Sequence, residues 1–130
     1  IYHETLLVKN ETIYVWYAKG FSVGLGKSFV LDYIQKRVKR RILLKVIAHD
    51  NPELKEYIDE TPNALRQVVY AKTPPEWQSG TVVMLYGKRK VAFLSHAEHI
   101  AVVIESVDIY KALMGMFSVI WTLSDKDNDI

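Results

Sequence analysis

Residues 12–18 read TIYVWYA, and residues 42–48 read ILLKVIA. Both stretches consist almost entirely of β-branched, aromatic and aliphatic residues, a composition typical of strands buried on both faces of a parallel sheet. Residues 28–41 lie between them and carry apolar residues at helical spacing, namely Val30, Tyr33, Ile34 and Val38. The order strand, helix, strand predicts a right-handed parallel crossover.

The same patterns continue outward from this unit. A short helix is expected over residues 1–9 and another over 51–60, where Asn51-Pro52 suits a helix start. Four more strands are expected, at residues 65–71, 81–86, 91–95 and 100–105. Ser106 is expected to cap a last helix that runs to about Leu123. The sequence therefore predicts an α/β domain over residues 1–124, with a mixed, mostly parallel sheet of about six strands flanked by helices. A polar tail is expected at 125–130.

Composition limits the class of protein. The 130 residues are 49% hydrophobic and 25% charged, as in an ordinary globular domain, and include no cysteine. No apolar run reaches the roughly 18 residues that a membrane-spanning helix needs, so we expect a cytoplasmic protein with no membrane partner. The chain starts at Ile1 inside a predicted helix, and we expect it to be part of a longer protein.

One glycine-rich segment is close to a phosphate-binding loop. Residues 20–28 read GFSVGLGKS between a predicted strand and a predicted helix. A phosphate loop needs a glycine five residues before the Gly-Lys-Ser, and here Phe21 occupies that position. We therefore expect a strand-to-helix loop without nucleotide hydrolysis, and anion binding at the helix start remains open.

The carboxyl ends of the predicted parallel strands form the candidate ligand site, because ligands of open α/β sheets bind there. The residues that follow the first three strands are Lys19, Gly20, Ser22, His49, Asp50 and Lys72. A turn at residues 49–52 explains His49 equally well. His96 and His99 flank Glu98 without further ligands nearby, so we expect a plain turn there and no metal or cofactor.

Two helical segments leave alternatives open. The basic run at residues 36–41 is typical of a solvated helix end, with a nucleic-acid patch as the alternative. In the last helix one stripe, expected to cover the sheet, contains Ile109, Leu113, Met116, Phe117 and Ile120. Further apolar residues beside this stripe indicate either deeper burial or a homodimer interface, and they are Tyr110, Met114 and Trp121.

Several of these stretches together resemble one known family. Residues 13–18, Tyr33, residues 42–47, the YGKRKVAFLS stretch at 86–95, residues 100–105 and residues 110–121 are similar to the TrmB-like transcriptional regulators of archaea and uncultured bacteria. In those proteins a phospholipase-D-like regulatory domain follows a winged helix. The resemblance implies a phospholipase-D-like half and a homodimer that contacts DNA only through a winged helix outside this chain. It also implies a possible small-molecule effector.

The resemblance does not extend to catalysis. Phospholipase D enzymes use a His-x-Lys pair, whereas the four histidines here are followed two positions later by Thr5, Asn51, Glu98 and Ala101. We therefore expect a regulatory domain without catalytic residues. The alternatives are a degenerate half of a phospholipase-D-type phosphodiesterase or nuclease, and a pure oligomerisation module.

Overall fold

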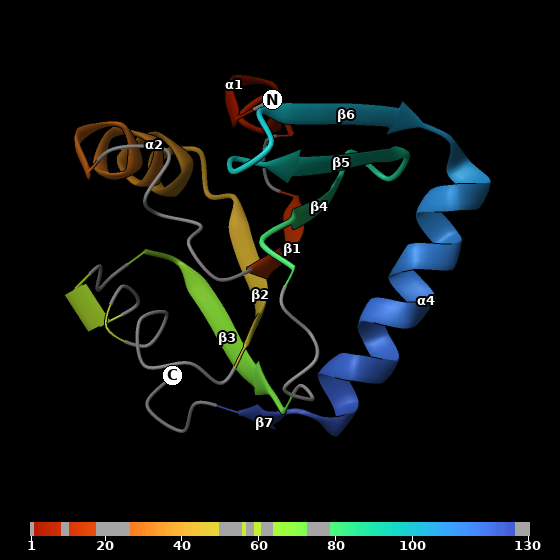
Figure 1. Cartoon of the computed structure of the whole chain (residues 1–130). Coiled ribbons are helices and arrows are strands. Elements are labelled where there is room, and N and C mark those ends of the chain that lie inside the picture. The colour runs from red at the N-terminus through yellow and green to blue at the C-terminus, as the bar shows by residue number, and fades with distance from the viewer. Residues whose placement is uncertain are drawn as a thin grey trace.

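A computed structural model describes residues 2–8, 11–17, 27–49, 56, 59–60, 64–72 and 79–126 (Figure 1). The helices are α1 (Tyr2–Thr5), α2 (Lys27–Lys39) and α4 (Val107–Leu123). The strands are β1 (Thr12–Tyr17), β2 (Leu43–His49), β3 (Arg66–Ala71), β4 (Val82–Tyr86), β5 (Lys90–Ser95), β6 (Ile100–Glu105) and the two-residue β7 (Asp125–Lys126). The segments expected from composition thus form the expected elements. The glycine-rich segment and most of the helix expected at 51–60 lie outside the described residues.

The strands form one mixed sheet in the order β6-β5-β4-β1-β2-β3-β7. The central strands β1, β2 and β3 are parallel, as the crossover argument predicted. β4 then joins β1 antiparallel, and β5 and β6 continue as an antiparallel meander. Antiparallel pairings therefore outnumber parallel ones, contrary to the mostly parallel balance that we expected. The reason is the tight turns after β4 and β5, because a short turn can join only antiparallel strands.

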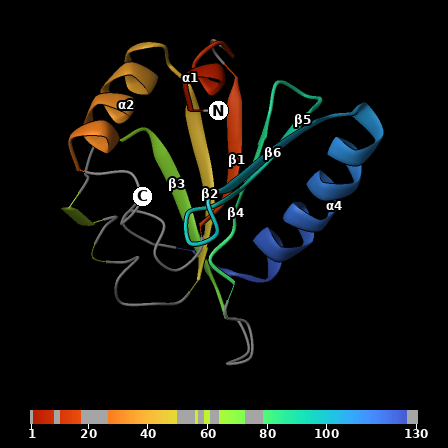
Figure 2. The ribbon, with the colours of Figure 1, turned by 45° about the horizontal axis from the view of Figure 1, so that its top comes forward.

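Helices cover both faces of the sheet (Figure 2). On one face, Ile13 and Val15 of β1 join a buried cluster that includes Leu6 and packs against Tyr2 and Tyr33 beside α1 and α2. On the other face, Tyr14 and Trp16 contact a second cluster built around Phe117 of α4. β1 thus alternates between fully buried aliphatic residues and half-buried aromatic ones. Both faces of β1 are covered, as expected, although the aromatic face is less completely buried than the aliphatic one.

One residue of the basic run is buried in the core. Arg37 has no exposed surface, and its guanidinium donates hydrogen bonds to the carbonyl oxygens of Ile42, Leu65 and Ala64. These bonds tie the end of α2 to the starts of β2 and β3. The expected solvated face is correct for Lys36, Lys39, Arg40 and Arg41, which are exposed, and wrong for Arg37.

Local sequence features fix the second half of the chain. The turn from β4 to β5 has positive φ at Gly87 and Lys88, a conformation that glycine adopts without strain. The Ser106 side chain accepts a hydrogen bond from the Ile109 amide and so caps α4, as predicted. Asp125 and Lys126, expected in a polar tail, pair with β3 as β7. No helix in the described part of the chain is long and apolar enough to cross a membrane.

Candidate functional site

The ligand residues predicted from the strand ends are described only in part. Lys19, Gly20, Ser22 and Asp50 lie outside the described residues. His49 pairs with Ala71 in the parallel register of β2 and β3, and the exposed Lys72 follows directly. The structure therefore places His49 and Lys72 together at the carboxyl ends of two adjacent parallel strands, where the sequence argument expected them.

His49 is a buried histidine whose acceptor nitrogen is occupied. Its side chain is 7% exposed, and Nε2 accepts a hydrogen bond of 2.8 Å from the indole N–H of Trp16. The two rings meet edge to face. An imidazole nitrogen that accepts must be unprotonated, so the proton of His49 sits on Nδ1. Burial lowers the pKa of His49 below its ordinary value of 6.5, because the apolar surroundings disfavour the charged form.

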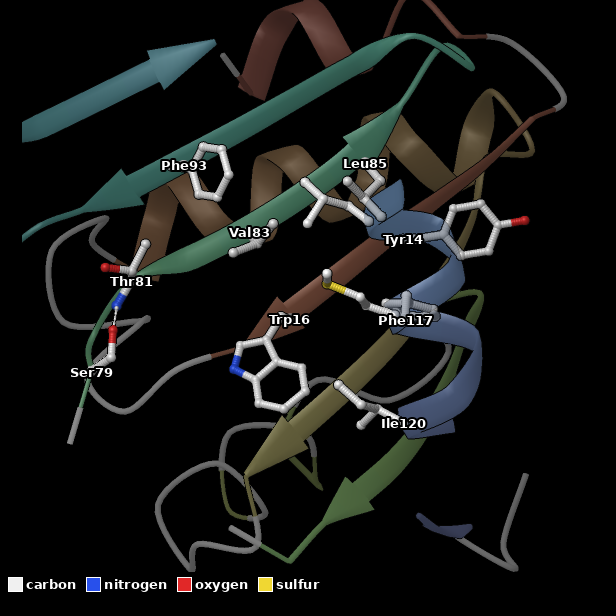
Figure 3. Close-up of a pocket in the computed structure, with 11 residues that line it drawn as sticks. Tyr14, Trp16, Ser79, Thr81, Val83, Leu85, Phe93, Phe117 and Ile120 are labelled. Atoms are coloured by element: carbon white, nitrogen blue, oxygen red, sulfur yellow. Dashed lines mark hydrogen bonds between the residues drawn. The ribbon is translucent and has the colours of Figure 1, made fainter. Parts of the chain in front are cut away.

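Trp16 also forms part of an apolar pocket between the sheet and α4 (Figure 3). The pocket has a volume of about 300 Å³. Its sheet side consists of Tyr14 and Trp16 from β1, Val83 and Leu85 from β4, and Phe93 from β5. All five side chains lie on the face that α4 covers, because each strand presents alternate residues to that face.

The helix side of the pocket comes from one flank of α4. Leu113, Met116, Phe117 and Ile120 line it. Phe117 is 8% exposed and contacts Tyr14 edge to face and Trp121 by stacking, with ring centroids 5.3 Å and 5.8 Å apart. These contacts hold α4 against the sheet beside the pocket.

The other described residues that line the pocket are Ser79 and Thr81, which precede β4. The Ser79 hydroxyl accepts a hydrogen bond of 3.1 Å from the Thr81 amide. Figure 3 shows both side chains together at one end of the pocket, away from Phe117. The pocket thus has a mostly apolar lining, with the hydroxyls of Ser79 and Thr81 at this end and the Tyr14 ring on the opposite side (Figure 3). None of the described residues that line it is charged.

The three residues proposed from sequence for a dimer interface face the sheet instead. Tyr110, Met114 and Trp121 are half-buried and pack against the cluster around Phe117. Of the stripe expected to cover the sheet, Leu113, Phe117 and Ile120 do so, whereas Ile109 and Met116 are 41% and 60% exposed. The prediction was wrong in the rotation of the helix. Because α4 is apolar around most of its girth, periodicity alone could not fix which stripe faces inward.

A second apolar stripe of α4 faces outward. It is formed by exposed residues spaced three and four apart, namely Ile109, Ala112, Met116, Val119 and Leu123. Val119 is 60% exposed and Leu123 is 81% exposed. β6, which leads into α4 through Ser106, is also an exposed edge strand that carries Ile100, Val102 and Val103 at 41–51% exposure. Exposed apolar side chains gathered on a helix face are a feature of interaction sites on soluble proteins.

Two solved structures share this architecture. The chain superposes on TrmBL2, an archaeal chromatin protein, with a TM-score of 0.63 and 15% identity, over 95% of this chain and 47% of that one. It superposes on Nuc, a phospholipase D family member from Salmonella typhimurium, with a TM-score of 0.67 and 10% identity, over 97% of this chain and 88% of that one. The chain has a phospholipase-D-like fold. It spans about half the length of TrmBL2, described as showing a novel mode of DNA binding.

Comparison of sequences adds no further relationship. No protein-family profile matches the chain, and no curated protein sequence matches it. Within the described residues, no cluster of three or more His, Asp or Glu side chains could hold a metal ion. His96, Glu98 and His99 lie in the turn between β5 and β6, as predicted.

The pocket was missed at the level of sequence. Alternation in β1 places Tyr14 and Trp16 on one face, and this was the one local signal that two large aromatic side chains share a surface. The position of the pocket depends also on the path of α4 across β4 and β5, which no local pattern specifies.

Proposed function

We propose that this chain is the non-catalytic dimerisation and sensor domain of a TrmB-like transcriptional regulator, with winged-helix DNA-binding domains attached to it in the full protein. One combination of observations carries the proposal: the fold is shared with the DNA-binding protein TrmBL2, and the sequence has no His-x-Lys pair.

The absence of the His-x-Lys pair argues against phosphodiester hydrolysis by this chain alone. The reaction needs a histidine that attacks phosphorus and a lysine that holds the phosphate oxygens. None of the four histidines has a lysine two residues later. Nε2 of the buried His49 is not free to attack a substrate, because its lone pair already accepts a hydrogen bond from the indole N–H of Trp16. A charged phosphodiester would also be poorly solvated in the apolar pocket between the sheet and α4, whose described lining residues carry no charge.

The outward stripe of α4 supports the dimerisation part of the proposal. A helix of 17 residues is about 25 Å long and about 10 Å across, so its outward face projects roughly 250 Å². A stable protein interface buries about 800 Å² on each partner. α4 alone would therefore give a weak dimer, and the exposed apolar edge strand β6 would have to contribute to a tight one.

Dimerisation would give such a domain a means of control. A ligand that favours one arrangement of two copies shifts the equilibrium between arrangements by its differential affinity. The arrangement of the two copies would set the spacing of the two attached DNA-binding domains. That spacing would in turn set the affinity for a DNA site made of two half-sites.

A phosphodiesterase is the second candidate, because the match to Nuc covers 88% of that protein. It requires a His-x-Lys pair from another segment or another subunit. The parent gene separates the two functions. A winged helix upstream of Ile1 supports the regulator, whereas a second α/β half bearing His-x-Lys supports the phosphodiesterase.

The experiment compares DNA binding and phosphodiester hydrolysis by the full parent protein and by the 130-residue chain. The full parent protein is expected to bind duplex DNA with an affinity that falls steeply with salt, whereas the 130-residue chain is expected to bind DNA weakly and to leave bis(p-nitrophenyl) phosphate intact. Hydrolysis of that compound by the chain, lost on substitution of any of its histidines, would contradict the proposal.

A further inference from the structure

The apolar pocket between the sheet and α4 has the size and lining of a ligand site. Ligand pockets are concave, mostly apolar and equipped with a few placed polar groups, with volumes from roughly 300 Å³ upward. This pocket has a volume of about 300 Å³, and two of its hydroxyl-bearing residues, Ser79 and Thr81, lie together at one end (Figure 3).

The lining excludes most polar ligands. The indole N–H of Trp16 is already donated to His49, so the hydrogen-bonding groups left among the described lining side chains are three hydroxyls, and the Ser79 hydroxyl already accepts from the Thr81 amide. A sugar or nucleotide buried there would leave several of its own polar groups without partners, at a cost of about 1–3 kcal/mol each. Charged ligands are disfavoured more strongly, because no described lining side chain carries an opposite charge.

The lining favours an aromatic ligand. Trp16, Phe93 and Phe117 offer ring surfaces, and aromatic pairs gain from offset or edge-to-face packing beyond the area that they bury. Met116 adds a thioether, which makes favourable contacts with ring edges. A cavity of about 150 Å³ is known to hold benzene. A pocket of twice that volume accommodates two fused rings.

We propose that this pocket binds an uncharged two-ring aromatic molecule that carries at most one hydrogen-bonding group, directed toward Ser79 and Thr81. The inference rests on the proposed sensor function and names the effector's chemical class. Met116 connects the two roles, because it lines the pocket and belongs to the outward stripe of α4. A bound ligand would therefore change the surface that we assign to the dimer.

Indole is the probe, since it is an uncharged bicyclic molecule with one N–H group. We expect saturable binding by isothermal titration calorimetry with a negative change in heat capacity, the mark of apolar burial. We also expect shifts of the Met116 and Ile120 methyl resonances. Glucose and maltose should give neither effect.

Val83→Trp places a bicyclic side chain in the space assigned to the ligand, and should weaken indole binding at least tenfold. Leu31→Trp places the same side chain at a 41% exposed position on α2, away from the pocket and from β6, and should leave binding unchanged. Circular dichroism monitors folding. If Val83→Trp fails to fold, Val83→Ala replaces it and should bind the larger 2-naphthol more tightly than the unmodified chain does.

Three results would overturn the inference: no saturable binding of indole, indole binding that Val83→Trp leaves intact, or tight binding of a sugar in its place. Binding seen only when a variant has separated the dimer would show that a second copy fills the pocket, and would overturn it as well. Sedimentation of the same samples keeps the two proposals apart. A dimer that ignores indole removes the pocket assignment alone, and a monomer that binds indole removes the dimerisation function alone.

Discussion

The indole N–H of Trp16 lies 2.8 Å from Nε2 of His49, and this hydrogen bond joins a wall of the apolar pocket to the end of β2. The bond exists only while His49 is neutral, because a protonated imidazole has no lone pair to offer. The pocket wall is therefore sensitive to the protonation of a residue outside the pocket.

The first prediction concerns the pH dependence of stability. Burial lowers the pKa of His49 in the folded state below 6.5. Above pH 6.5 the folded and unfolded states are both neutral at this residue, so it has no effect. Below pH 6.5 the unfolded chain takes up a proton that the folded chain does not, so the free energy of unfolding falls until the folded-state pKa is reached.

Urea unfolding between pH 7.5 and 5 measures this slope, and NMR titration of the His49 ring measures the pKa. In His49→Gln the amide oxygen can still accept from Trp16, and the slope assigned to His49 should vanish. An unchanged slope in that variant would show that other groups cause it.

The second prediction concerns Arg37. Arg37→Met removes a buried donor from the carbonyl oxygens of Ile42 and Ala64, whereas that of Leu65 keeps the Leu44 amide. An unsatisfied buried polar group costs about 1–3 kcal/mol. We expect a loss of roughly 3 kcal/mol or more in the free energy of unfolding. Arg40→Met, three residues further along and exposed, should change stability by less than about 0.5 kcal/mol. Equal effects of the two variants would contradict the buried role of Arg37.

The third prediction concerns the contact of α1 with the β4–β5 hairpin. The Glu4 carboxylate binds the Lys90 ammonium and accepts a hydrogen bond of 3.2 Å from the Tyr86 hydroxyl. The bond to Lys90 holds the pKa of Glu4 below its ordinary value of 4.5. The stability from this contact is therefore present above pH 4.5 and is lost as the pH falls through the folded-state pKa.

Glu4→Gln should reduce the loss of stability on acidification below pH 4.5. Glu105→Gln breaks the more exposed pair with Arg89, and should have a smaller effect because solvent screens that pair. Acid titration followed by circular dichroism compares the two. A larger effect of Glu105→Gln would contradict the assignment.

The fourth prediction concerns Phe117, which holds α4 to the sheet. Phe117→Ala removes a side chain that packs between Tyr14 and Trp121, and large-to-small changes of this kind cost about 3–5 kcal/mol. Met116→Ala, at a 60% exposed position, should cost much less. Thermal unfolding of both variants tests the inward and outward assignment of the helix. A greater loss from Met116→Ala would reverse it.

Sequence predicted the elements well because their signals are local. β-Branched runs predicted strands at residues 12–18 and 42–48, which are observed at 12–17 and 43–49, and Ser106 predicted the start of α4. Arg37 was assigned to a solvated face because a run of cations does not reveal which side chain turns inward. The outward stripe of α4 was misassigned because two of its faces are apolar, and only the packing of Phe117 against Tyr14 selects one.

The candidate site was predictable only in part for the same reason. Ligands of open α/β sheets bind at the carboxyl ends of the strands, and this rule predicted that His49 and Lys72 lie close together. They do lie at the carboxyl ends of the adjacent strands β2 and β3. The pocket is formed by β1, β4, β5 and α4, which are far apart in sequence. Its existence depends on the angle at which α4 crosses the sheet, a tertiary property.

The central claim is that the outward stripe of α4 joins two copies of the chain. Sedimentation equilibrium of the unmodified chain, Val119→Lys and Ser118→Lys tests it most directly, because both substitutions place a lysine at exposed neighbouring positions and only Val119 belongs to the stripe. The account predicts a dimer for the unmodified chain and Ser118→Lys, and at least a tenfold weaker dimer for Val119→Lys. A monomer at every concentration, or a dimer that Val119→Lys leaves unchanged, would contradict it.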